Sequence, residues 1–106
     1  MGRYNCKFAY YAGDKKTADV VIREGAVTSK RYTDAALDLP FGNLPDSRIS
    51  RKTIDLFFDE HCVPEHRANI RQILDYYGIE KYDAYEICRL TNGVMVDTPF
   101  RIVWQD

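Results

Sequence analysis

The chain has 106 residues and a formal net charge of −1 at pH 7, with 45% hydrophobic and 29% charged residues. These values predict one soluble domain that is large enough to bury its own core, and they exclude a bulk electrostatic attraction to nucleic acid. Because no apolar run reaches the roughly 18 residues of a membrane span and no signal-peptide core is present, we expect a cytoplasmic protein without a membrane partner.

The first third of the chain predicts an antiparallel meander. Its three strands are expected over residues 4–11, 18–23 and 26–32. In the first of them Cys6, Phe8 and Tyr10 recur at every second position, which is strand spacing. We expect one face of the meander to lie on a core, because a small sheet needs a packed hydrophobic face to be stable.

Residues 33–49 are expected to form an irregular crossover from the sheet to the helices. Pro40 and Pro45 interrupt any regular element there. The same stretch holds Leu39, Phe41 and Leu44. We therefore expect it to lie against the core and not in solvent.

Three short helices are expected within residues 50–91. Ser50 is a suitable N-cap for the first helix, over residues 51–61, in which Ile54, Phe57 and Phe58 form an apolar stripe.

The second and third helices have their own start and stop signals. The second is expected to begin at Pro64, which is favoured at the first helical position, and to end before Gly78, which suits a left-handed cap. The third is expected to follow Asp83, whose side chain can cap it, and to end at Asn92-Gly93.

The last part of the chain, residues 94–104, is expected to be a closing strand, since Phe100, Ile102 and Trp104 alternate with their neighbours. The order of elements predicts an α+β fold, in which a small antiparallel sheet of three N-terminal strands plus a C-terminal strand is covered by about three short helices. We expect residues 1–106 to form this single domain, with the meander within residues 1–32.

The segments TADVVIREGAV, LDLPFGN, FFDEHCVPEHRANIRQILDYYGI and YDAYEICRLTNGVMVDTPFRIVW resemble a group of small, mostly uncharacterised proteins of Firmicutes and their mobile elements. Some related segments precede kinase-like domains of the HipA type, the toxin kinases of persistence modules. The shared pattern falls on Cys62, Pro64, Arg67, Asn69, Gly78, Tyr82, Asp83, Gly93, Asp97 and Trp104. The resemblance implies an accessory or regulatory module and carries over no catalytic residue, because the chain has no glycine-rich phosphate loop, H-R-D or D-F-G.

His61, Cys62 and His66 are the weak candidates for a metal site, with Asp59 and Glu65 nearby. Zinc takes four ligands, and only one cysteine and two histidines lie close together in the sequence. We therefore expect no metal and no other cofactor.

Cys62 is also the one conceivable nucleophile, with His61 or His66 as its base. Nothing in the sequence supplies an oxyanion site, so no catalytic residue is expected and the protein is expected not to be an enzyme.

The chain has three cysteines, Cys6, Cys62 and Cys88. An odd number of cysteines argues against a disulfide framework and for a reducing compartment.

The charge is uneven along the chain. Residues 1–53 carry ten Lys and Arg against six Asp and Glu, whereas residues 54–106 carry five against ten. Either the two halves attract each other within one fold, or the N-terminal half presents a basic face.

The candidates for a nucleic-acid or partner-binding surface are Arg48, Arg51, Lys52, Arg67, Asn69 and Arg71, with Tyr76 as an exposed aromatic residue. In the alternative interpretation, Arg67 and Asn69 pair with carboxylates such as Asp59 or Asp97 and hold the helix junctions.

Three functions follow from these observations. The first is a non-enzymatic protein–protein interaction or regulatory module of bacterial or mobile-element origin, whose partner is another protein or a second copy of the chain in a homodimer. The second is a nucleic-acid-binding regulatory protein that uses a basic Arg/Lys face. The third is a phage-encoded inhibitor of a host defence nuclease.

Overall fold

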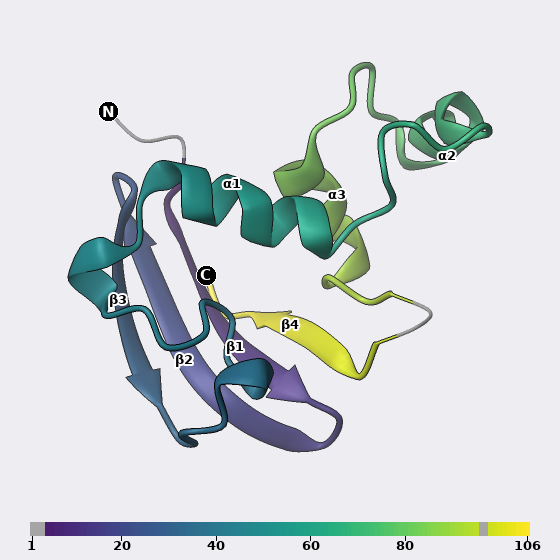
Figure 1. Cartoon of the computed structure of the whole chain (residues 1–106). Coiled ribbons are helices and arrows are strands. Elements are labelled where there is room, and N and C mark those ends of the chain that lie inside the picture. Colours follow the sequence, from purple (N-terminus) through teal and green to yellow (C-terminus); the bar gives the residue numbers. More distant parts are fainter. Residues whose placement is uncertain (1–3, 96–97) are drawn as a thin grey trace.

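Four strands form one antiparallel sheet in the computed structural model, which describes residues 4–95 and 98–106. The strands are β1 (Cys6–Ala12), β2 (Lys15–Arg23), β3 (Ala26–Arg31) and β4 (Phe100–Trp104), in the spatial order β3-β2-β1-β4. The C-terminal strand, which the alternation of its apolar residues predicts, returns to the sheet and pairs with β1 (Figure 1).

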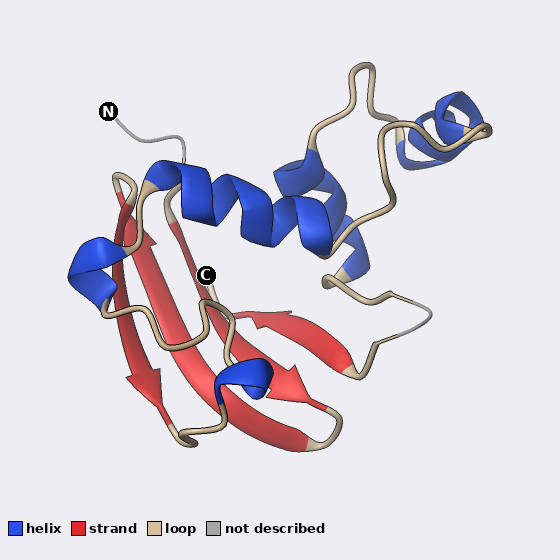
Figure 2. Ribbon diagram, viewed as in Figure 1, coloured by secondary structure: helices blue, strands red, loops and turns tan. Residues whose placement is uncertain are grey.

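The helices lie between β3 and β4 in the sequence (Figure 2). They are the 3-10 turns η1 (Ala36–Asp38) and η2 (Asp46–Arg48) and the α-helices α1 (Arg51–Glu60), α2 (Ile70–Tyr77) and α3 (Ala84–Thr91). Helices α1 and α3 lie over one face of the sheet, and α2 lies beyond the C-terminal end of α1 (Figure 1). The predicted α+β fold is confirmed.

Across the described residues, no helix combines the length and the apolar character that crossing a bilayer requires.

The helix ends follow the local signals of the sequence. The Ser50 side chain accepts a hydrogen bond from the Thr53 amide at 3.3 Å and begins α1. The Asp83 carboxylate accepts one from the Glu86 amide at 3.2 Å and begins α3. Gly78 follows α2 with φ of 73°, a left-handed conformation that costs glycine little. These caps were predictable because each depends on residues three or four positions apart.

The largest differences from the prediction are at the starts of α2 and β4, and β2 begins at Lys15, ahead of its expected start at residue 18. Helix α2 begins at Ile70 and not at Pro64, because residues 64–69 are all exposed and offer no apolar face to pack, which is where most helical stability in proteins originates. Strand β4 begins at Phe100 and not at residue 94; Val94 and Met95 lie outside any strand, and residues 96–97 of the expected strand are outside the described residues.

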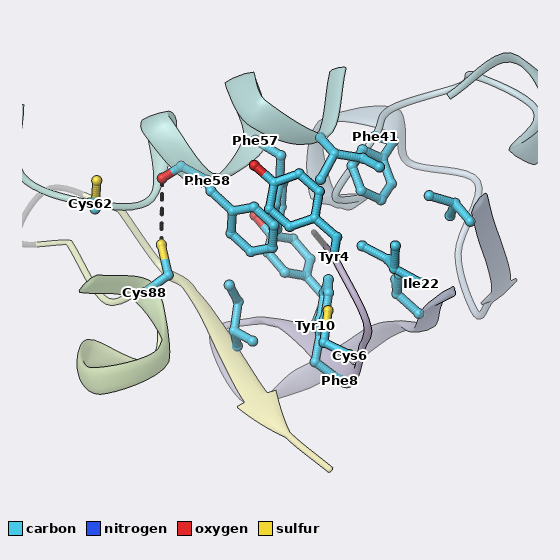
Figure 3. Packing of buried hydrophobic residues seen from close by; sticks show 14 of the residues in the cluster. Tyr4, Cys6, Phe8, Tyr10, Ile22, Phe41, Phe57, Phe58, Cys62 and Cys88 are labelled. Carbon is cyan, nitrogen blue, oxygen red and sulfur yellow. Dashed lines mark hydrogen bonds between the residues drawn. The ribbon is translucent and has the colours of Figure 1, made fainter. Parts of the chain in front are cut away.

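The core lies between the sheet and α1 and α3 (Figure 3). The rings of Phe8 on β1 and Phe57 on α1 are stacked, with their centroids 5.8 Å apart. The Cys88 thiol of α3 donates a hydrogen bond to the Phe58 carbonyl at 3.4 Å, which ties α3 to α1. Each aromatic side chain buried in this way contributes on the order of 2–3 kcal/mol to folding.

The crossover of residues 33–49 packs on the same side of the sheet. Leu39 and Phe41 are buried, and the Phe41 ring lies 5.1 Å from that of Phe57, which confirms that this irregular segment lies against the core. Leu44, which was expected to join them, is 38% exposed.

Candidate functional site: the open face of the sheet

One face of the sheet takes no part in the core. Directly opposed residues of neighbouring strands point to the same face, so the strand register assigns every side chain to one side. The side opposite the helices carries Lys7, Ala9, Tyr11, Lys16, Asp19, Val21, Arg23, Ala26, Thr28, Lys30, Arg101 and Val103, with Tyr32 directly after β3. We call this surface the open face. None of its residues belongs to the buried cluster under the helices.

The open face is predominantly basic. Its positively charged side chains are Lys7, Lys16, Arg23, Lys30 and Arg101. Asp19 is its one acidic residue in the four strands, all of which lie in the described part of the chain. The Asp19 carboxylate pairs with the Lys16 ammonium at 3.0 Å, so the remaining cations have no opposite charge on this face to balance them.

A β-bulge places Lys16 on the open face. Tyr10 is opposite Ala18 and Tyr11 is opposite Lys16, so Thr17 is an extra residue in β2. Thr17 is fully buried, and its hydroxyl donates a hydrogen bond to the Tyr10 carbonyl at 3.3 Å. Without the extra residue, strict alternation would turn Lys16 towards the helices, because a shift by one position moves a side chain to the other side of the sheet.

Tyr32 is the most exposed aromatic residue of the open face, with 44% of its surface accessible. Its amide donates to the Thr17 carbonyl at 2.8 Å, which continues the ladder beyond β3, and its hydroxyl donates to the Asp19 carboxylate. The ammonium groups of Lys16 and Lys30 lie 5.3 and 5.4 Å from the ring centroid. The ring is therefore held at its edge by a hydrogen bond and has two cations close to it.

The electrostatics of this cluster keep Asp19 charged. Burial by itself would raise the pKa of Asp19, but the hydrogen bond from Tyr32 and the ammonium of Lys16 outweigh it and lower the pKa. The same hydrogen bond raises the pKa of Tyr32. At neutral pH the Asp19 carboxylate is therefore ionised, and it binds both the Tyr32 hydroxyl and the Lys16 ammonium.

A second aromatic–cation pair lies on the other side of Lys16. Tyr11 on β1 is directly opposite Lys16 on β2 and Arg101 on β4. The Arg101 guanidinium carbon is 4.2 Å from the centroid of the Tyr11 ring, which is cation–π distance. Tyr32, Lys16, Tyr11 and Arg101 therefore follow one another in a row across all four strands.

A hollow on the helical side of the molecule is acidic. It has a volume of about 360 Å³ and is lined by Tyr4, Arg51, Asp55, Asp59, Glu65, Tyr82, Asp83, Ala84 and Tyr85. Four of these side chains are acidic and one is basic. A basic sheet face and an acidic hollow among the helices thus lie in different parts of the molecule.

The basic residues proposed from the sequence fall into two separate groups. Arg48, Arg51 and Lys52 lie at the N-terminal end of α1, whereas Arg67 and Arg71 lie beyond its C-terminal end (Figure 1). A helix of 10 residues is about 15 Å long, so these two groups do not share one compact surface.

Local contacts occupy several of these residues. Arg71 donates to the Asp75 carboxylate at 2.7 Å and to the carbonyls of Ile79 and Glu80, which holds the loop after α2. Arg67 donates to the Asn69 side chain at 3.0 Å, so these two residues bond to each other. Asp97, considered as their partner, is outside the described residues.

Tyr76 projects from α2 and is 84% exposed, as its position off the apolar stripe predicts. It lies on the helix farthest from the open face (Figure 1).

His61, Cys62 and His66 are not assembled into a site. The two ring nitrogens of His61 are bound to the Tyr10 hydroxyl and the Phe57 carbonyl, at 2.6 and 2.7 Å, and His66 is exposed. Within the described residues, no group of three or more His, Cys, Asp or Glu side chains is arranged to hold a metal ion.

Cys62 is only 3% exposed, and its sulfur lies 3.0 Å from the Tyr82 hydroxyl. Hydrogen bonding with Cys88 lowers the pKa of Cys62 against the effect of burial, and the Tyr82 hydroxyl lowers it further. The ring nitrogens of His61 are bound to Tyr10 and Phe57, so the structure does not bring His61 and Cys62 together as a base and its nucleophile.

The sequence contained two signals for the open face that pointed only to its general location. One was the basic surplus of residues 1–53. The other was the alternation of β1 and β2, which separates Lys7 and Tyr11 from the core residues. The bulge at Thr17 and the position of Arg101 beside Tyr11 depend on the strand register and had no local signal.

The open face is therefore defined by the chain's own geometry. Comparisons with protein-family models, with curated proteins and with solved structures found no match to this chain.

Proposed function

We propose that this protein is a non-enzymatic binding module that holds nucleic acid on the open face of its sheet. The observation that carries the proposal is the charge of that face, on which five basic side chains stand beside a single carboxylate that is itself paired. Clustered Lys and Arg on one surface supply the phosphate contacts from which nucleic-acid affinity mainly arises.

The separation of charge supports the same partner. A polyanion is attracted to the open face and repelled by the carboxylates around the helical hollow, so it is oriented before contact. This arrangement lets a chain with a net charge of −1 bind a polyanion, because the local field and not the total charge decides the encounter.

The experiment compares two triple variants with the same change of net charge. Lys7→Glu/Arg23→Glu/Lys30→Glu changes three exposed side chains of the open face. Arg48→Glu/Arg51→Glu/Lys52→Glu changes the group at the start of α1, where added carboxylates also suit the helix dipole. Binding of a fluorescein-labelled mixed-sequence oligonucleotide is followed by anisotropy between 50 and 200 mM salt, concentrations chosen because phosphate contacts are screened strongly in this range.

We expect the wild-type protein to bind with an affinity that falls as salt rises, and the open-face variant to lose at least about tenfold in affinity. The α1 variant should stay within about twofold of wild type. Absence of salt-dependent binding by the wild-type protein, or an equal loss in both variants, would refute the open face as the interface. A loss confined to the α1 variant would return the interface to the residues proposed from the sequence.

The protein–protein interaction expected from the sequence remains the second candidate, and one groove favours it. The groove has a volume of about 540 Å³ and is lined mainly by Val63, Pro64, Tyr77, Ile87, Val94 and Met95. Val94 is 56% exposed, and the neighbouring helix α3 exposes Leu90 to 55%. An apolar segment of a protein partner, including a second copy of this chain, fits such a surface.

This second candidate has its own test. Val94→Asp should reduce the capture of a specific protein from a host lysate, and of a second copy of the chain in sedimentation, whereas Leu37→Asp should not. Leu37 is 89% exposed and lies on η1. Both variants therefore replace an exposed apolar side chain by aspartate, and they differ only in where that side chain lies. The regulatory, HipA-associated, mobile-element or phage setting stays a prediction from the sequence and would follow from the identity of the captured protein.

A further inference from the structure

The open face combines cations with aromatic rings in a fixed order. Across the strands the order is Tyr32, Lys16, Tyr11 and Arg101, from the end of β3 to β4. Neighbouring strands are about 4.8 Å apart, so the row is about 14 Å long and the two rings are separated by about two strand spacings. Each ring has a cation within 5.3 Å of its centroid.

A nucleic acid can stack on aromatic rings of a flat sheet only where its own bases are free. The bases of a duplex are stacked on one another, and proteins that read a duplex insert a helix or a ribbon into a groove. The open face is built from strands that lie side by side, and the β1–β2 and β2–β3 connections are the two-residue turns Gly13-Asp14 and Glu24-Gly25. In a single strand, by contrast, the bases can stack on exposed aromatic rings while the phosphates meet nearby cations.

The Tyr32 ring is held in place before any ligand arrives. Its backbone is bonded to Thr17 and its hydroxyl to Asp19, so the ring loses little freedom when a base stacks on it. Lys16 and Lys30 are close enough to contact the phosphates on either side of that base. Arg101 can serve in the same way beside Tyr11, or can stack on a base through its own guanidinium plane.

We propose that the open face selects single-stranded nucleic acid, with Tyr32 and Tyr11 as base-stacking residues and Lys16, Lys30 and Arg101 as their phosphate contacts. This inference rests on the proposed function of the same face and adds the class of ligand to it. RNA and DNA share the chemistry that the row recognises.

The test compares four labelled probes with the full-length chain: a 20-nucleotide dT strand, a 20-nucleotide U strand, a 20-base-pair duplex and heparin. Wild-type protein should bind both single strands at least about tenfold more tightly than the duplex. Tyr32→Leu should weaken single-strand binding by about tenfold while heparin binding is unchanged. Tyr32→Phe keeps the ring but loses the hydroxyl that bonds to Asp19, so its affinity should lie between those of wild type and Tyr32→Leu. Tyr11→Leu should resemble Tyr32→Leu.

A second readout uses the unaltered protein. A strand that contains 5-iodouridine, cross-linked by light, should attach to Tyr32 or Tyr11, and peptide mapping identifies the residue. Attachment confined to the residues of α1 or α2 would overturn the proposal, whatever the stability of the leucine variants. Tighter binding of the U or of the dT strand would identify RNA or DNA as the preferred source, and either result supports the proposal.

The failures of the two proposals are distinguishable. If the charge variant of the open face loses binding but Tyr32→Leu does not, the face binds polyanions by charge alone, and only the single-strand inference fails. If the duplex binds as tightly as the single strands, the inference fails in the same way. If no nucleic acid binds in a salt-dependent manner, both proposals fail together.

Discussion

The hydroxyl of Tyr10 on β1 donates a hydrogen bond to Nε2 of His61 at the C-terminal end of α1, at 2.6 Å. The direction follows from the other ring nitrogen, since Nδ1 lies 2.7 Å from the Phe57 carbonyl, which can only accept. A neutral imidazole has one donor and one acceptor, and both are used here. The pair joins the centre of the sheet to the helix above it through a partly buried polar contact.

Tyr10→Phe should destabilise the protein by about 1–3 kcal/mol, because it leaves the partly buried Nε2 of His61 without a donor. The free energy of unfolding in urea is the measurement. Tyr76→Phe removes the same hydroxyl from a side chain that is 84% exposed and should change the stability by less than about 0.5 kcal/mol. Equal effects of the two variants would show that the Tyr10 hydroxyl is not paired as described.

Stability should fall as the pH is lowered from 7.5 to 5.5. Burial lowers the pKa of His61 below its ordinary value of 6.5, against the hydrogen bond to Phe57 and the nearby Glu60, so the unfolded chain takes up the proton first. The stabilisation is therefore complete above pH 6.5 and is lost progressively as the pH drops towards the depressed pKa of the folded state.

The slope of unfolding free energy against pH in this range is the readout for that prediction. His61→Asn should flatten the slope, even if it also lowers the absolute stability. His66→Asn is the matched control, because that side chain is exposed, and it should leave the slope as in wild type. A slope that survives in His61→Asn would assign the effect to another group.

Gly93→Ala should cost about 1–3 kcal/mol. Gly93 has φ of 64°, and an added Cβ would lie 2.8 Å from Cδ1 and 3.1 Å from Cγ1 of Ile102, a core side chain that is 1% exposed. Gly13→Ala introduces the same backbone strain, at φ of 63°, into open space. Thermal unfolding of the two variants separates strain from overlap: Gly93→Ala should be the less stable one, and equal losses would show that the core adapts around Ile102.

Asp46→Ala should expose the free edge of β3. The Asp46 carboxylate accepts from the Ser29 amide at 2.8 Å and from the Ser29 hydroxyl at 2.5 Å, so it occupies the side of the strand that a second sheet would use. We expect a loss of about 1 kcal/mol and a rise in self-association with concentration, measured by sedimentation velocity. Asp34→Ala removes the same charge from an exposed position in the same crossover and should do neither.

Much of the fold could be predicted because its signals are local. Ser50, Asp83 and Gly78 mark helix ends through contacts with residues a few positions away, and each does so in the structure. The alternation of Cys6, Phe8 and Tyr10 identified the buried side of β1. The start of α2 was misjudged at Pro64, because a residue that suits a helix start cannot supply the apolar packing that makes a helix form there.

By itself, then, the sequence determined the α+β class, the caps and the sides of β1 and β4 that face the core. Only the tertiary structure decided which basic residues share a surface, because that depends on register: one additional residue at Thr17 turns Lys16 outward, and the return of β4 beside β1 brings Arg101 to Tyr11 from about ninety positions away in the chain. Side chains so distant in sequence become neighbours only through hydrogen bonding between strands, and no short motif encodes such a pairing.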